Sequence, residues 1–99
     1  MSEFQPSRSG LGTHSTVPSA ASSTTILAAN LLRRGATIFN TDSNALSLNL
    51  AGGTATTTTA FHVLLAQNTY FEVPFGYTGL ITGIWAGDST GAANVCEFT

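Results

Sequence analysis

Residues 71–85 read FEVPFGYTGLITGIW and hold four of the nine aromatic residues of a chain otherwise rich in Thr, Ser, Ala and Gly. Residues 71–73 alternate apolar and acidic side chains, which is the pattern of a strand with one buried face. Pro74 cannot donate a ladder hydrogen bond, so it ends this strand or lies at a sheet edge. Residues 80–86 alternate again after a turn rich in glycine. The stretch therefore predicts two strands and the junction between them.

Two interpretations of this junction stay open. Gly83 and Trp85 share one face of the second strand, and the small glycine leaves room for another ring or backbone. Trp85 is then the core of a hairpin, or a contact between subunits. Phe75 and Tyr77 lie in the turn itself, where we expect them to reach a neighbouring molecule.

The rest of the chain, from Thr24 onward, repeats the same short strand patterns. The clearest is ALSLNL at residues 45–50, where every second residue is leucine. Frequent turn signals separate six or seven such strands, which is typical of a β-sandwich. We therefore predict an all-β fold, a small antiparallel β-sandwich or jelly-roll-like domain, over residues 24–99. Further strands are expected at residues 24–29, 36–40, 60–65, 69–73, 80–86 and 94–98.

Residues 1–23 differ in composition from the rest. They are rich in Ser, Gly and Pro, and their large apolar residues are isolated: Phe4, Leu11 and Val17. Such a segment cannot bury enough surface to fold by itself. A flexible tail is one interpretation. We favour an extended N-terminal arm that lies on a neighbouring subunit through these three side chains.

Charge is scarce throughout the 99-residue chain. Only 8% of residues are charged, and no Lys occurs, whereas ordinary soluble domains carry about 25%. No cation follows Arg34, while four acids do. A domain without cations beyond its first residues cannot neutralise phosphate groups, so we expect no nucleic-acid partner. A surface of hydroxyls and amides suits burial against other proteins.

Arg33 and Arg34 are the only cations of the predicted domain. The planar guanidinium binds carboxylates with two parallel hydrogen bonds. We expect at least one of the two to meet Glu72, Glu97 or an acid of a neighbour, either within the fold or across a subunit contact. For one of the two arginines, the alternative interpretation is a charge that lies in solvent before a strand.

Little in the sequence points to catalysis or to a cofactor. His14, His62 and Cys96 have no zinc-like spacing, and no phosphate-binding loop occurs. A pair of acids such as Glu72 and Glu97 arises easily by chance. We therefore predict no enzyme activity, no cofactor and no metal. The single cysteine excludes an internal disulfide framework and fits a reducing cytoplasm. The chain shows neither a signal-peptide pattern nor a membrane-spanning run, so no membrane partner is expected.

Three segments resemble small structural proteins of tailed bacteriophage virions: RRGATIFN at residues 33–40, YFEVPFGYTGLITGIW at residues 70–85 and GAANVCEF at residues 91–98. The resemblance covers about residues 30–99 and excludes the N-terminal arm. It rests on Arg33, Arg34, Gly35, Asn40, Tyr70, Phe71, Glu72, Pro74, Tyr77, Gly79, Gly83, Trp85, Gly91, Ala93, Val95 and Glu97.

The resemblance implies a capsid decoration or cement protein. Such a protein is made in the cytoplasm of the host bacterium, forms a homo-oligomer, often a trimer, and binds the major capsid protein on the surface of the virion. The alternative is a tail, neck or fibre component, including a receptor- or glycan-binding module. An exposed cluster of Tyr77, Trp85 and an acid would favour the glycan-binding alternative. The residues expected at the subunit or capsid interface are Arg33, Arg34, Phe75, Tyr77, Trp85, Glu72, Glu97, Phe4, Leu11 and Val17.

Overall fold

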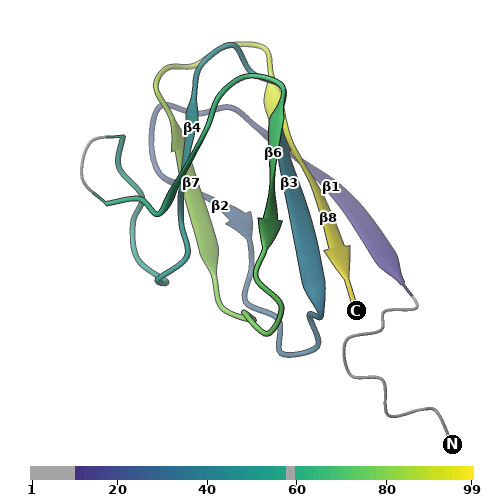
Figure 1. Ribbon diagram of the computed structural model, residues 1–99. Coiled ribbons are helices and arrows are strands. Elements are labelled where there is room, and N and C mark those ends of the chain that lie inside the picture. Colours follow the sequence, from purple (N-terminus) through teal and green to yellow (C-terminus); the bar gives the residue numbers. More distant parts are fainter. Residues whose placement is uncertain (1–10, 58–59) are drawn as a thin grey trace, which may run out of the picture.

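The protein is a sandwich of two antiparallel β-sheets, which confirms the predicted all-β fold (Figure 1). The computed structural model describes residues 11–57 and 60–99. Within them the strands are β1 (Gly12–Pro18), β2 (Thr24–Leu27), β3 (Gly35–Asn40), β4 (Leu46–Asn49), β5 (Val63–Leu65), β6 (Thr69–Val73), β7 (Ile81–Trp85) and β8 (Ala92–Phe98).

The two sheets have four strands each. Sheet A has the order β1-β8-β3-β6, and sheet B has the order β2-β7-β4-β5. The chain changes sheet at almost every connection, and only β4 and β5 follow each other within one sheet. β6 and β7 therefore lie in different sheets, so the hairpin interpretation of residues 71–85 is wrong. The segment after Pro74 crosses from sheet A to sheet B instead of folding back beside β6.

The core lies between the sheets and follows the period-2 pattern of the sequence. In β3 the buried Ala36 and Ile38 alternate with half-exposed residues. In β4 Leu46 and Leu48 are fully buried, and the polar Ser47 and Asn49 on the other face are buried as well. Gly83 is required for this packing, because a Cβ there would lie 2.7 Å from Cγ1 of Ile26. The close approach that the sequence predicted at this glycine therefore comes from side chains of the same core.

Part of the predicted arm belongs to the sandwich. β1 pairs with β8 in an unbroken register from Gly12 opposite Phe98 to Pro18 opposite Ala92. The expected boundary at Thr24 is therefore not where the folded part begins. A strand at a sheet edge is held by backbone hydrogen bonds, which do not require apolar side chains. The prediction of an arm was wrong for these residues because it relied on their polar composition.

The three apolar residues of the predicted arm have different environments. Leu11 is exposed, and Val17 is half-buried against the core. Phe4 lies outside the described residues. Of the three, Leu11 alone therefore presents an apolar side chain to solvent in the described structure.

A buried carboxylate ties β8 to the connection between β3 and β4. Asp42 accepts hydrogen bonds from the backbone N–H groups of Gly91 at 2.9 Å and Asn44 at 2.8 Å. Burial alone would raise the pKa of Asp42, but these backbone donors, together with side-chain hydrogen bonds of Asn44 and Ser19, outweigh it and lower the pKa below its usual value of 3.8. The ionised form is therefore the one that the fold stabilises.

Acid should weaken the fold through this carboxylate. The folded pKa of Asp42 is below the unfolded one, so its contribution is complete above about pH 4 and is lost as the pH falls through the folded pKa. We expect the urea midpoint of wild type to fall more between pH 7 and pH 3 than that of Asp42→Asn. Equal falls in the two proteins would show that Asp42 makes no such contribution.

Candidate docking surface at one end of the sandwich

The loop between β2 and β3 is fastened to the fold by Arg33. Its side chain is fully buried, and its Nε donates to Oε2 of Glu97 at 2.8 Å. The remaining guanidinium nitrogens donate to the backbone oxygens of Tyr77 at 3.1 Å, Gly79 at 3.0 Å and Ala28 at 2.6 Å. One guanidinium thus joins β8, the β6–β7 connection and its own loop. The prediction that at least one arginine meets Glu72, Glu97 or an acid of a neighbour is confirmed for Arg33, whose partner is Glu97 of the same chain.

Asn30 adds a second set of bonds to the same loop. Its backbone N–H donates to the oxygen of Thr78 at 2.8 Å, and its side-chain amide donates to Oε1 of Glu97 at 3.3 Å. Its side-chain oxygen accepts from the backbone N–H of Leu32 at 3.0 Å. The loop is therefore held in one conformation, yet Leu31 is 89% exposed and Leu32 is 74% exposed.

These leucines belong to an apolar surface at one end of the sandwich, which we call the apolar end: Leu11, Leu31, Leu32 and Phe75. All four side chains are exposed. Backbone hydrogen bonds from Thr99 to Leu11 and from Arg34 to Phe98 bring the start of β1, the β2–β3 loop and the end of β8 together. Figure 1 shows that the β2–β3 and β6–β7 connections lie at this same end.

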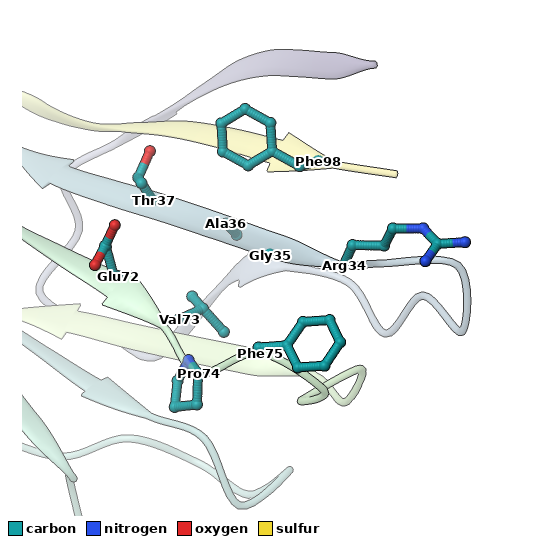
Figure 2. Close-up of a pocket in the computed structure, with 9 residues that line it drawn as sticks. All are labelled: Arg34, Gly35, Ala36, Thr37, Glu72, Val73, Pro74, Phe75 and Phe98. Atoms are coloured by element: carbon teal, nitrogen blue, oxygen red, sulfur yellow. The ribbon is translucent and has the colours of Figure 1, made fainter. Parts of the chain in front are cut away.

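A groove on the outer face of sheet A adjoins the apolar end (Figure 2). Gly35 forms its floor, since no atom lies within 4 Å of the position that a Cβ would take. Phe98 is the register neighbour of Gly35 on one side, and Phe75 follows β6 on the other. The groove has a volume of about 430 Å³, and Arg34 and Glu72 also line it. Its size and its two rings suit an apolar side chain of a partner protein.

Several residues expected at an interface are used inside the chain. Trp85 is 1% exposed and donates from Nε1 to Oδ1 of Asn40 at 3.0 Å, so it is a core residue and its assignment to an interface is corrected. Tyr77 is half-buried, and its hydroxyl donates to the oxygen of Leu80 at 2.6 Å. The exposed cluster of Tyr77, Trp85 and an acid that would have favoured glycan binding is therefore not formed, because the indole fills the core.

The remaining expected residues keep a place at the surface. Phe75, Glu72 and Arg34 are exposed and line the groove. Leu31, Leu32 and Phe98 are not among the residues predicted from the sequence to lie at an interface. Residues 26–32 are apolar at every position except Asn30, so alternation does not distinguish inward-facing from outward-facing side chains there. The one feature of the sequence that could have indicated their exposure is the position of Leu31 and Leu32 between a turn-forming asparagine and an arginine.

Within residues 11–57 and 60–99 no three His, Cys, Asp or Glu side chains gather into a group able to hold a metal ion. In the same ranges no helix is long and apolar enough to cross a membrane.

Comparisons with known proteins found no match: no family model, no curated protein and no solved structure is similar to this chain.

Proposed function

We propose that the protein is a non-enzymatic structural subunit that docks onto a larger protein assembly through the apolar end. The observation that carries the proposal is the β2–β3 loop, in which a fully buried guanidinium holds two adjacent leucines out in solvent. A domain of this size has room for leucines in its core, so a rigid loop that exposes two of them is typical of a contact surface.

The physical benefit of such a loop lies in binding. Burying a leucine side chain against a partner yields about 1.5–3 kcal/mol. Because the bonds of Arg33 and Asn30 already fix the backbone, little further ordering is needed when the partner binds. Preorganisation of this kind raises affinity by lowering the entropy cost of association. The low charge of the chain also limits the desolvation cost of covering its surface.

The specific assembly that we propose is the capsid of a tailed bacteriophage, with the protein as a decoration or cement subunit on the major capsid protein. This assignment is supported by the resemblance of residues 33–40, 70–85 and 91–98 to virion structural proteins. The first two segments carry Arg33, Gly35 and Phe75, which build or line the docking surface. A cryo-EM map of the particle would place the chain on the shell, or on the tail or neck.

The docking role predicts that surface leucines matter for assembly and not for folding. The free energy of unfolding of the double variant Leu31→Ser/Leu32→Ser should lie within about 0.5 kcal/mol of the wild-type value, as is usual for surface substitutions. Its occupancy on capsids stripped of the protein should fall at least about tenfold, which corresponds to a loss of about 1.4 kcal/mol. Occupancy can be measured by quantitative gel analysis of sedimented particles.

Leu64→Ser is the matched control. Leu64 is also a leucine exposed to solvent, at 57%, but it lies in β5 of sheet B and not at the apolar end. We expect this variant to bind like wild type. Wild-type occupancy of the double variant, or an equal loss in the control, would overturn docking through the apolar end.

A further inference from the structure

The outer edge of β1 differs from the other three sheet edges. β2 has four residues and a register shift between Thr25 and Leu27, and β5 has three residues. β6 carries Glu72 and is followed by Pro74. Short length, irregularity, charge and proline are the devices by which proteins keep sheet edges from pairing. β1 has seven residues, GTHSTVP, in an unbroken register, with no acidic residue, lysine or arginine, and its one proline, Pro18, is its last residue.

The hydrogen bonds at the two ends of β1 show which of its backbone groups are free to pair. Thr99 donates to the oxygen of Leu11, and Ser19 donates to the oxygen of Gly91. In an antiparallel ladder, residues bonded to the neighbouring strand alternate with residues whose N–H and C=O point the other way. Odd-numbered residues of β1 therefore bond to β8, and the backbone groups of Gly12, His14 and Thr16 point toward the open side.

β1 also receives little cover from the other sheet. Val17 is its one half-buried residue, while Thr13 and Ser15, which point to the same side of the sheet, are exposed. The strand is thus held mainly by its ladder with β8. Its open edge offers a partner a second ladder along Gly12, His14 and Thr16, which ends at Pro18 because proline has no N–H.

We propose that β1 pairs with β1 of a second copy across a two-fold axis at Ser15, which joins the two A sheets into one continuous sheet. A two-fold contact lets a single strand be its own complement. The axis at Ser15 places His14 opposite Thr16 of the second copy, Thr13 opposite Val17 and Gly12 opposite Pro18, where the missing N–H of proline leaves one ladder bond unmade at each end. This register also brings the outward-pointing groups of His14 and Thr16 together as a hydrogen-bonded pair.

The chemistry of the paired strands agrees with a second copy as the partner. Every side chain brought opposite another is neutral or an imidazole, so no like charges of carboxylates or guanidinium groups meet. Hydroxyl and β-branched side chains are favourable cross-strand neighbours. The resulting oligomer is a dimer, which distinguishes it from the trimer implied by the resemblance to virion proteins. It uses a different surface from the apolar end, so the proposal stands independently of the proposed function.

Thr16→Pro tests the pairing without removing a backbone hydrogen bond of the monomer, although it does remove the exposed side-chain bond from Oγ1 of Thr16 to Oδ1 of Asn94 at 3.4 Å. The N–H of Thr16 points outward, and proline is tolerated at a sheet edge where its missing N–H faces solvent. We expect wild type to sediment as a dimer and Thr16→Pro to dimerise at least about tenfold more weakly, with an unchanged circular dichroism spectrum. The Leu31→Ser/Leu32→Ser variant should remain a dimer.

Cysteine pairs test the register in a Cys96→Ser background. Ser15 would face Ser15 of the second copy as a non-hydrogen-bonded pair, about 4.5 Å apart between Cα atoms, which suits a disulfide. Ser15→Cys should therefore form a cross-linked dimer on mild oxidation, whereas Thr13→Cys should not. The proposal would be overturned by any of three results: a monomeric wild type, a trimer that Thr16→Pro does not affect, or equal cross-linking by Thr13→Cys and Ser15→Cys.

Discussion

Replacing Arg33 with glutamine should lower the free energy of unfolding by about 3–5 kcal/mol, the usual cost of breaking a buried ion pair by removing one partner. The variant leaves the largely buried carboxylate of Glu97 without its cation. It also leaves the backbone oxygens of Ala28, Tyr77 and Gly79 without their guanidinium donors. Since small domains are stable by only about 5–15 kcal/mol, the loss is a large part of the total. Urea denaturation followed by circular dichroism measures it.

Arg34→Gln is the matched control for this prediction. Arg34 is the neighbouring arginine and is exposed, so its replacement should change stability by less than about 0.5 kcal/mol. Arg33→Lys should recover only part of the loss, because an ammonium group lacks the planar fork that reaches four acceptors here. If Arg33→Gln unfolds at the wild-type midpoint, the guanidinium does not fasten the loop.

The consequence for docking follows from the same contacts. Arg33 is not itself at the surface, but it fixes the loop that presents Leu31 and Leu32. An Arg33→Gln protein that still folds should therefore bind the assembly more weakly, because the loop must be ordered on binding. Of the two expected arrangements, a contact within the fold or one across a subunit contact, Arg33 forms the first, so we expect its effect on assembly to be indirect.

Replacing Trp85 with alanine should cost about 3–5 kcal/mol, the usual range for removing a large aromatic side chain from a core. The indole is 1% exposed in the core between the sheets. Its loss also removes one of the two donors to Oδ1 of the fully buried Asn40, leaving the N–H of Asp42 at 3.0 Å. The cavity and the weakened polar contact both lower the free energy of unfolding. Circular dichroism during thermal and urea unfolding is the appropriate measurement.

Tyr70→Ala controls for the loss of an aromatic ring from the surface. Tyr70 lies on β6 and is exposed, so we expect its replacement to lower the free energy of unfolding by less than about 1 kcal/mol. Trp85 is the only tryptophan, so its fluorescence gives a further check on wild type: emission should shift to longer wavelength when the protein unfolds. A loss in Tyr70→Ala as large as that in Trp85→Ala would contradict the core assignment.

The strands from β2 onward could be predicted from local patterns, whereas β1 could not. The alternation at Leu46 and Leu48 identified a buried face, and the scarcity of cations made a contact between Arg33 and an acid such as Glu97 a reasonable expectation. In both cases a few residues carry the information, because side chains in a strand alternate between two faces and an isolated buried charge requires a counterion. Fold class and one stabilising contact were therefore accessible from the sequence.

The neighbours of each strand were decided only by the tertiary structure. Alternation shows which face of a strand is buried, but it contains no information on which other strand completes the ladder. β1 meets β8 at the opposite end of the chain, and β6 and β7 separate into different sheets. The exposure of Leu31 and Leu32 was equally inaccessible, because it depends on hydrogen bonds from Arg33 and Asn30 to segments distant in sequence. Local sequence determines the strand, whereas long-range packing determines its partners and the side chains that remain in solvent.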